Sequence, residues 1–507
     1  MPDSRTTFRL PDFSRPQTAL LWAALAVALR LAYMGWIELL PEEAYYWQYA
    51  QNLAPGYIDH PPLVGATIWV FTRLLGISEF ALRAGAVFWW MLSAWAVWKL
   101  ACELRGKCAA ACAVMLFALL PYFFGAGLMI TPDSPLLAFW AWALWFLYRI
   151  FFHNSRGAWY GLALCLGLGM LSKYTIALLG PSLLLFMLLD REARRSLFRI
   201  DPYLCALLAL LLFSPVILWN MDNQWASFAF QGSQRIHQAP RFYLPEFLLH
   251  LLAVLTPAGL AVFLRLPGLS VNRRELTFLG CLILPAVLLF AGFSLQHQVK
   301  LNWSGPVFLA LLPVLGASVL WQRHEQAGWR RIVGLVWGAS VPLLFAIYWA
   351  SLHFLAFGLP YVPYTQKMTR FLAWEDLAAQ VIEIEGQLAQ TSGAPVTVVG
   401  MDKHYLASEL DFYRRKLSPQ ARTVRATAGR SLFGQPALMY RFWSRPENYS
   451  GHTLIMLSRT PSDLREELLA PCLQSLDAPR QIVTRRNGYI TGRFHYRIGY
   501  AYRKCAG

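Results

Sequence analysis

Charged residues are scarce in this sequence. Asp, Glu, Lys and Arg make up 14% of the 507 residues and hydrophobic residues make up 57%, whereas a soluble domain carries roughly 25% charged residues. The mean hydropathy is +0.39. Such a composition excludes a soluble globular chain and a disordered chain, and it predicts a polytopic membrane protein.

Other common features are also missing. We find no internal repeat and no low-complexity tract in the sequence. No cleavable signal peptide is predicted, because the first 17 residues are polar and basic and the apolar run after them is long enough to remain as an anchor. Six of the eight cysteines lie in or beside apolar runs without metal-ligand spacing. We expect those six to pack as small hydrophobic side chains.

What the chain has in abundance is long apolar runs, which recur along the first 350 positions. Each run is close to or above the roughly 20 residues that cross a bilayer as a helix. We therefore predict a polytopic α-helical membrane protein with about 11–13 transmembrane helices. The spans are expected at about 18–39, 80–103, 108–128, 133–151, 157–172, 174–190, 203–220, 244–264, 276–294, 303–321 and 330–353.

The formal charge of +17 is concentrated in alternate loops, above all in 191–199 and 323–331. This distribution indicates membrane topology rather than binding to nucleic acid. The positive-inside rule predicts a cytoplasmic N-terminus and an outward first loop at 40–79. An odd number of spans then puts the chain after about 354 on the outside as well.

The sequence pattern changes at about residue 366, and residues 366–507 are predicted to form a small α/β domain. TVVGM (397–401) and TLIMLS (453–458) are typical of buried strands, and segments 402–417 and 461–469 favour helices. Cys472 and Cys505 fall in this outward domain, where the compartment permits a disulfide. The alternative is two unrelated thiols, one buried and one near the chain end.

Acidic residues gather where the apolar runs meet the outward loops. Glu42, Glu43 and Asp59 lie in the first loop, and Asp133 begins the span near 133–151. Loop solvation, helix N-capping or pairing with an arginine would each explain a single acid there. Acids on two spans could also meet in one cavity and do acid/base work or bind a metal.

These residues also carry a family resemblance. PEEAYYW (41–47), GYIDHPPL (56–63) and TPDSP (131–135) resemble the polyprenyl-phosphate-sugar-dependent glycosyltransferases of the GT-C superfamily. The sequence is most similar to the bacterial dolichyl-phosphate-mannose-protein mannosyltransferase-like enzymes, which include the aminoarabinose transferase that modifies lipid A. Segments 171–179, 299–313 and 405–413 extend the resemblance over nearly the whole chain.

The resemblance implies a GT-C-type fold with a transmembrane catalytic domain at 1–365 and an extracytoplasmic domain at 366–507. Such enzymes sit in the bacterial inner membrane and move a sugar from a polyprenyl (undecaprenyl) phosphate to a lipid, glycan or protein hydroxyl on the outer, periplasmic face, usually with inversion. The first acid of an Asp-Glu pair is the base in this family. Here Glu42 replaces the Asp and adds a methylene, so either Glu42 still serves or Glu43 takes over.

The resemblance also implies a metal site and a phosphate site. Asp59, Asp133 and His237 match positions that are similar to a divalent-metal site, such as zinc. The candidates for the leaving phosphate are one histidine that acts only when protonated and three cations, namely His60, Arg83, Lys173 and Lys300. The alternatives are an ion pair of Arg83 with Glu79 or Asp133, lysines that lie at the membrane interface, and a His237 that is only solvated.

Aromatic residues crowd the same loop. Tyr45, Tyr46, Trp47 and Tyr57 are expected either to line a groove for a sugar and a polyprenyl chain or to anchor the chain at the membrane interface.

Two other classes of function compete with a transferase. A polytopic transporter or lipid flippase would use intramembrane acids to carry ions, although the acids here lie at the ends of spans. A scaffold would bind cell-wall components through its outward domain. Only an enzyme would consume a polyprenyl-phosphate sugar.

Overall fold

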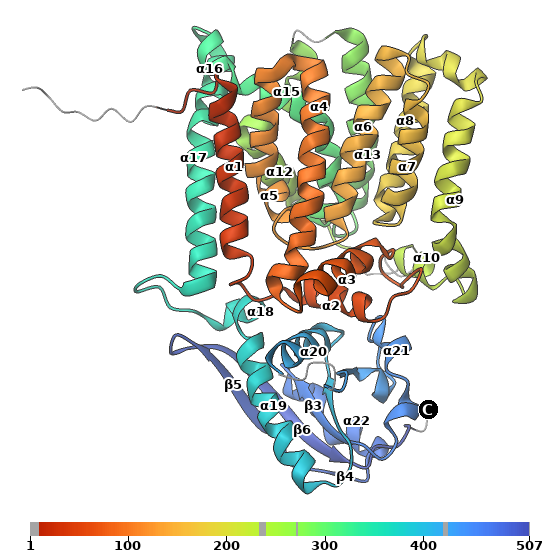
Figure 1. Cartoon of the computed structure of the whole chain (residues 1–507), viewed down its shortest axis with the longest axis vertical. Helices are drawn as coiled ribbons and strands as arrows, with labels where there is room; N and C mark the ends of the chain where they lie inside the picture. The colour runs from red at the N-terminus through yellow and green to blue at the C-terminus, as the bar shows by residue number, and fades with distance from the viewer. Residues whose placement is uncertain (1–9, 233–239, 270–271, 419–423, 506–507) are drawn as a thin grey trace, which may run out of the picture. The chain divides into compact units, whose positions relative to one another are not determined.

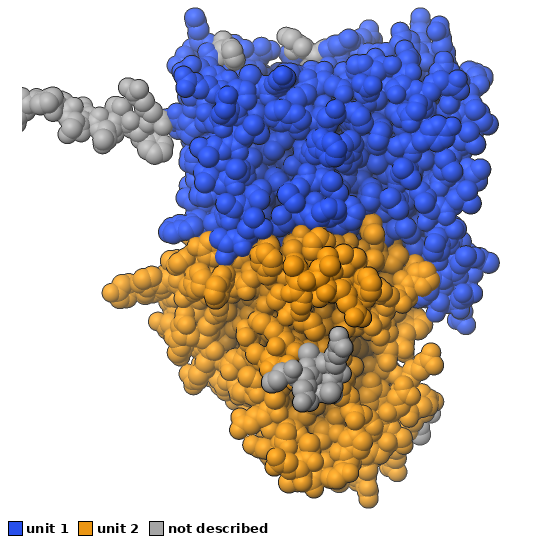
Figure 2. Space-filling view, in the orientation of Figure 1, with its two compact units in different colours: residues 1–32, 86–349 blue, residues 33–85, 350–507 orange. Residues whose placement is uncertain are grey.

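The structure, a computed structural model, describes residues 10–232, 240–269, 272–418 and 424–505. The chain forms two compact units, and each unit is discontinuous in sequence. Unit 1 comprises residues 1–32 and 86–349, and unit 2 comprises residues 33–85 and 350–507 (Figure 2). The two units divide the chain differently from the predicted boundary at 365, because residues 33–85 belong to the same unit as the C-terminal tail.

Unit 1 is helical, and its long helices run side by side (Figure 1). Helices α1, α4 and α17 continue into unit 2. The α-helices with residues in unit 1 are α1 (Pro16–Tyr33), α4 (Glu79–Leu119), α5 (Pro121–Ala126), α6 (Asp133–His153), α7 (Ala158–Met170), α8 (Leu179–Leu189), α9 (Asp201–Asp222), α10 (Ala226–Gln231), α12 (Leu244–Leu264), α13 (Arg273–Ser294), α14 (Leu301–Ser304), α15 (Leu312–Val319), α16 (Trp321–His324) and α17 (Gly328–Phe357).

Six helical segments are long and apolar enough to cross a membrane within the described parts of the chain. They are Asp133–His153, Asp201–Asp222, Leu244–Leu264, Arg273–Ser294, Leu301–Arg323 and Gly328–Phe357. Helix α4 is broken at Gly106, whose φ of 80° lies in the left-handed region that favours glycine. This break separates the predicted spans 80–103 and 108–128. The predicted pair at 157–190 is present as two shorter apolar helices, α7 and the segment Tyr174–Leu189.

Close packing of small residues holds unit 1 together. Helix α4 carries a run of buried small side chains from Ala109 to Ala113. A Cβ atom on Gly316 would lie 2.3 Å from the Ala109 carbonyl oxygen, so α15 approaches α4 at a distance that only glycine permits. The prediction of a polytopic helical membrane fold is confirmed.

Unit 2 combines the first-loop helices with an α/β layer. Its α-helices are α2 (Pro41–Gln51), α3 (Leu63–Leu75), α18 (Thr369–Leu372), α19 (Trp374–Thr391), α20 (Tyr405–Leu417), α21 (Tyr440–Trp443) and α22 (Glu466–Leu469). Its strands are β1 (Val396–Gly400), β2 (Ala428–Gly429), β3 (Thr453–Ser458), β4 (Ser475–Leu476), β5 (Arg480–Arg486) and β6 (Tyr489–Tyr500).

The strands form one mixed sheet of order β2-β1-β3-β6-β4, with β5 also paired to β6. Strands β1, β2 and β3 are parallel, and β6 is antiparallel to β3. The chain leaves β1 through α20 to reach β2 on one side, while β3 lies on the other side of β1. The direction of the connections thus reverses between β1 and β3, which is where open α/β sheets commonly bind ligands.

The predicted α/β domain and its two strands are confirmed, but one helix is wrong. The predicted helix 461–469 is a 3₁₀ turn at Pro461–Leu464 followed by the single turn of α22. Arg465 interrupts it with φ −64° and ψ 146°, which is extended backbone. Cys472 and Cys505 form a disulfide with their Cα atoms 4.7 Å apart, so of the two alternatives left by the sequence the structure has the bridge.

Candidate active site

The first acidic pair lies at the start of α2 in unit 2. Pro41 is the first helical residue, where a missing N–H costs nothing. The carboxylate of Glu43 accepts a hydrogen bond from the Leu40 N–H at 3.1 Å, which satisfies a donor at the helix start. Glu42 and Glu43 are adjacent and both lie at the positive end of the helix dipole. Their environments nevertheless differ completely.

Glu43 is fully buried and forms a two-pronged ion pair with Arg83. The Arg83 Nη2 and Nε atoms lie 2.6 and 3.0 Å from the two carboxylate oxygens. The remaining N–H groups of Arg83 donate to three backbone carbonyls, those of Met34, Ile37 and Glu38, at 2.6 to 2.9 Å. All five N–H donors of this guanidinium are therefore used within the unit.

This geometry assigns Glu43 and Arg83 a structural role. Arg83 keeps no N–H for a phosphate, contrary to what the sequence led us to expect. Arg83 does form an ion pair, which was the alternative that the sequence offered. Its partner is Glu43 and not Glu79 or Asp133. Glu79 pairs instead with Lys416, at 2.7 Å.

Glu42 is half exposed and remains available for chemistry. Its side chain is 40% exposed, and one of its oxygens accepts a hydrogen bond from Arg370 Nη2 at 2.8 Å. Its second oxygen accepts no hydrogen bond from the residues that the structure describes. The Arg370 guanidinium also lies over the Tyr405 ring, 5.2 Å from its centroid. Arg370 and Tyr405 thus position Glu42, and neither was identified from the sequence as a site residue.

Tyr405 also lines a cavity of about 480 Å³ in unit 2. The loops that follow β1 and β3 form much of its wall, at the reversal point of the sheet. Burial raises the pKa of Asp402 in this wall to about 6. The lining is almost entirely polar and consists of Gln366, Thr369, Asp402, Tyr405, Ser458, Arg459, Thr460, Asp463, Arg493 and His495.

Asp59 is buried in the same unit among aromatic side chains. It accepts hydrogen bonds from the hydroxyls of Tyr45 at 3.0 Å and Tyr49 at 2.5 Å. Burial raises the pKa of Asp59, and the hydrogen bonds from the two tyrosine hydroxyls lower it in part. The arrangement holds the loop 52–62 against α2.

The four aromatic residues expected at a groove are buried instead. Tyr45, Tyr46, Trp47 and Tyr57 are all at most 7% exposed. The Tyr57 ring stacks on Tyr49 at 3.7 Å between centroids. In this structure they are buried side chains of unit 2. His60 lies edge-on to Tyr46 at 5.7 Å.

Asp133 lies in unit 1 at the first position of α6. Its carboxylate caps no helix, because Pro132 holds the N-cap position and no side-chain cap bond forms. The two oxygens are instead bound by Lys173 Nζ at 2.7 Å and by the Asn302 side-chain amide at 2.8 Å. Tyr122 donates a third, longer hydrogen bond at 3.4 Å. Asp133 is thus a fixed carboxylate that also positions Lys173.

A cavity of about 380 Å³ adjoins this carboxylate in unit 1. It contains two of the predicted residues, Asp133 and Lys300, on an otherwise mainly apolar wall. A lysine beside an apolar surface suits a phosphate attached to a long hydrocarbon. The lining residues are Pro121, Tyr122, Gly125, Ala126, Met129, Thr131, Asp133, Lys300, Leu301 and Asn302. Asn302 was not predicted as a site residue. It lies in the motif at 299–313, and that motif could have indicated it.

The predicted metal ligands lie in different parts of the chain, with Asp59 in unit 2 and Asp133 in unit 1. Among the described residues, no group of three His, Cys, Asp or Glu side chains is arranged to hold an ion. Tyrosine hydroxyls bind Asp59, and an ammonium and an amide bind Asp133, so both carboxylates already accept hydrogen bonds. His237 lies outside the described residues.

Comparisons with known proteins support the resemblance that the motifs carry. Residues 59–219 match the family model described as dolichyl-phosphate-mannose-protein mannosyltransferase. The chain is 23% identical over 293 residues to the lipid A galacturonosyltransferase RgtD of Rhizobium johnstonii. The aligned region covers 54% of this chain and 59% of that relative, less than two thirds of its length.

The fold is that of solved membrane proteins. ArnT from Cupriavidus metallidurans in the apo state matches with a TM-score of 0.64 and 17% identity, over 94% of this chain and 97% of that chain. The same protein bound to undecaprenyl phosphate matches with a TM-score of 0.60 and 16% identity, at the same coverage. The Archaeoglobus fulgidus oligosaccharyltransferase matches with a TM-score of 0.51 over 78% of this chain. The chain is therefore a multi-pass membrane protein with the fold of these solved proteins, and part of it is similar to the dolichyl-phosphate-mannose-protein mannosyltransferase family and to a lipid A transferase.

Proposed function

We propose that the chain is an integral membrane glycosyltransferase. It moves a sugar from a polyprenyl phosphate, such as undecaprenyl phosphate, to a hydroxyl of a lipid, glycan or protein acceptor. The similarity of nearly the whole chain to a protein solved with undecaprenyl phosphate supports the donor class. The relative named a lipid A galacturonosyltransferase favours a lipid acceptor.

The observation that carries the proposal is the contrast between the two acids of α2. Glu42 is half exposed and has a free oxygen among the described contacts, whereas Glu43 is buried against Arg83. Glu42 is therefore the base. The acceptor O–H bond breaks and its proton moves to Glu42, while the oxygen lone pair forms the new bond to the sugar C1. The bond from C1 to the phosphate oxygen breaks, its electron pair leaves on the phosphate, and C1 inverts.

The cavity beside Asp133 is the proposed phosphate site. Lys300 lines it, and Asp133 holds Lys173 at 2.7 Å. A positive charge beside the departing phosphate stabilises the charge that develops as the bond breaks. The apolar part of the wall would accept the first units of the polyprenyl chain.

The remaining expectations are part of this proposal. The protein lies in a bacterial inner membrane with its N-terminus in the cytoplasm and the 366–507 region in the periplasm. A divalent metal at Asp59, Asp133 and His237 stays a prediction, and no step above uses one. Elemental analysis of the purified protein tests it, since a metal-free preparation with activity that chelators do not change would exclude a required ion.

The test of the base uses a deletion strain complemented with variants of the full chain. We expect Glu42→Gln to lower product formation by about 10²- to 10⁴-fold, as removal of a general base does. Mass spectra of lipids and surface glycans then show the loss of one sugar unit.

The matched control is Glu375→Gln. Glu375 is a 44% exposed acid of the same unit, paired with Lys416 at 3.4 Å, and its loss should leave the product unchanged. Normal product with Glu42→Gln would refute this role. If transport of a lipid continued without any sugar-modified product in the parent strain, the flippase alternative would replace the proposed function.

A further inference from the structure

A second cavity, of about 280 Å³, lies at the other end of unit 1 from Asp133. Its wall includes Phe151, which follows Asp133 by about five turns of α6, a rise of about 27 Å. That distance is close to the roughly 30 Å of a bilayer's hydrocarbon core. The cavity is therefore separate from the proposed phosphate site and belongs to the opposite leaflet.

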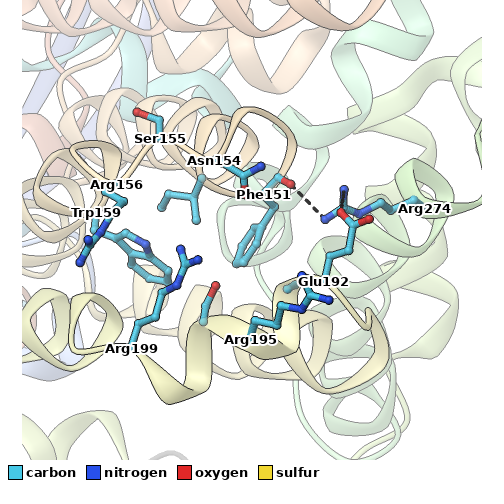
Figure 3. Close-up of a pocket in the computed structure, with 12 residues that line it drawn as sticks. Phe151, Asn154, Ser155, Arg156, Trp159, Glu192, Arg195, Arg199 and Arg274 are labelled. Carbon is cyan, nitrogen blue, oxygen red and sulfur yellow. Dashed lines mark hydrogen bonds and ion pairs between the residues drawn. The ribbon is translucent and has the colours of Figure 1, made fainter.

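Four arginines line this cavity. Figure 3 shows Arg156 and Arg199 near Trp159 at one end, with Arg195, Glu192 and Arg274 at the other. They come from three places in the sequence: the turn between α6 and α7, the 3₁₀ helix Ala193–Phe198 with the residue after it, and the start of α13.

Two of these arginines are neutralised and two are not. Arg274 contacts Asp190 at 3.0 Å and Glu192 at 2.7 Å and also donates to the Phe151 carbonyl. Arg156 contacts Asp201 at 3.2 Å. Among the described residues, no carboxylate lies within ion-pair distance of Arg195 or Arg199. The cavity therefore presents two uncompensated guanidinium groups, whose planar donors suit a phosphate.

Exposed apolar side chains flank these arginines in the sequence. Phe198 is 88% exposed and Ile200 is 61% exposed, and both are neighbours of Arg199 in sequence. Leu188 and Leu189, at the end of α8, are also exposed. Large side chains in this setting are suited to the boundary between headgroups and acyl chains. The arrangement therefore fits an amphiphile with an anionic head rather than a free anion.

We propose that this cavity binds the anionic headgroup of a membrane phospholipid, with Arg195 and Arg199 as its ligands. The positive-inside rule assigns this end of the helices to the cytoplasmic leaflet. Basic pockets between transmembrane helices on that side are suited to phosphate-bearing headgroups. The bound lipid would hold the loop 190–200 in place.

The test uses the purified full chain in nanodiscs of phosphatidylcholine with increasing phosphatidylglycerol. We expect phosphatidylglycerol to raise the unfolding temperature and to stay bound in native mass spectra. Arg195→Ala with Arg199→Ala should weaken this retention about 10- to 30-fold, since each arginine near the membrane surface contributes about 1 kcal/mol.

The control is Arg191→Ala with Arg194→Ala, which removes the same charge from the same loop but from residues that do not line the cavity. The control should retain the lipid. Equal loss in both double variants would overturn the site in favour of diffuse charge attraction. Equal retention of phosphatidylcholine would overturn the requirement for an anionic head. Displacement of the lipid by millimolar inorganic phosphate would replace a lipid site with a free-anion site.

Discussion

At the scale of single residues, the two acids of α2 should respond in opposite ways to the same change. Removing the charge of Glu43 leaves Arg83 buried without its partner, which costs about 3–5 kcal/mol. The exposed pair of Glu42 and Arg370 contributes about 0–1 kcal/mol. We therefore expect Glu43→Gln to lower the unfolding temperature of the purified protein clearly and Glu42→Gln to change it little.

A double variant provides the control for this prediction. Glu43→Gln combined with Arg83→Met removes both buried charges and should recover part of the lost stability. If Glu42→Gln and Glu43→Gln unfolded at the same temperature, the structural assignment of the Glu43–Arg83 pair would be wrong.

Glu409 on α20 gives a second prediction, about pH. It is fully buried, and no described residue donates a hydrogen bond to either of its oxygens. Burial raises the pKa of Glu409 well above its usual range, and Glu38, Glu43 and Glu42 raise it further while Arg83 lowers it. The native state therefore holds a proton that the unfolded state releases above about pH 4.5. The contribution of this bound proton to the free energy of unfolding is therefore present at low pH and is lost as the pH rises above about 4.5 towards the raised pKa of the folded state.

We expect the unfolding temperature to fall as pH rises from 5 to 9, and Glu409→Gln to make this slope shallower. Glutamine keeps the size of the side chain and has no proton to lose. Glu447→Gln is the control, because Glu447 is exposed and its lowered pKa means that it titrates below this range. An unchanged slope in Glu409→Gln would show that Glu409 is ionised in the folded protein.

At the scale of elements, the disulfide ties the chain end to the 3₁₀ turn Ala470–Cys472. The two cysteines are 33 residues apart, and closing a loop of this length contributes about 3 to 4 kcal/mol in the chain-entropy view. We expect Cys472→Ser with Cys505→Ser to lower stability and to speed amide exchange near β4. Cys281→Ser, at a buried free cysteine of α13, is the control, and it should not change exchange near β4. Unchanged exchange in the double variant would contradict a stabilising bridge.

The sequence predicted the elements with simple hydrophobic patterns and missed the others. Strand β3 was predicted with its observed bounds, because all six of its residues are buried and its central residues form one continuous apolar run. The β5–β6 hairpin was missed because β5 is polar on one side and ends in two arginines. A signal was nevertheless present, since Asn487 and Gly488 both have positive φ, at 49° and 81°. Asn-Gly between two strands is the preferred two-residue hairpin turn.

At the scale of the whole molecule, hydropathy found the helical membrane fold but not the grouping of the chain into units. Unit 2 depends on pairs that are far apart in sequence. The Leu39 N–H donates to the Tyr413 hydroxyl at 2.8 Å, and the Gln48 side chain donates to Asp411 at 3.1 Å. Such pairs leave no periodic signal in the sequence. The same limit applies to the site: the motif indicated Glu42, whereas only the structure shows that Arg370 positions it.

The pairing of α2 with α20 predicts how the C-terminal region behaves alone. A fragment of residues 366–507 lacks Trp47, whose ring meets Phe412 edge-on at 5.3 Å, and lacks Leu39 and Gln48, which donate to Tyr413 and Asp411. Because Phe412 and Tyr413 are fully buried in the whole chain, their exposure should destabilise α20. We expect amides of α20 to exchange faster in the fragment than in the full chain, while β1 and β3 at the centre of the sheet stay protected. Adding a peptide of residues 33–62 should restore part of the protection, because it supplies α2. Equal protection of α20 in the fragment and in the full chain would mean that the tail folds independently of the first loop.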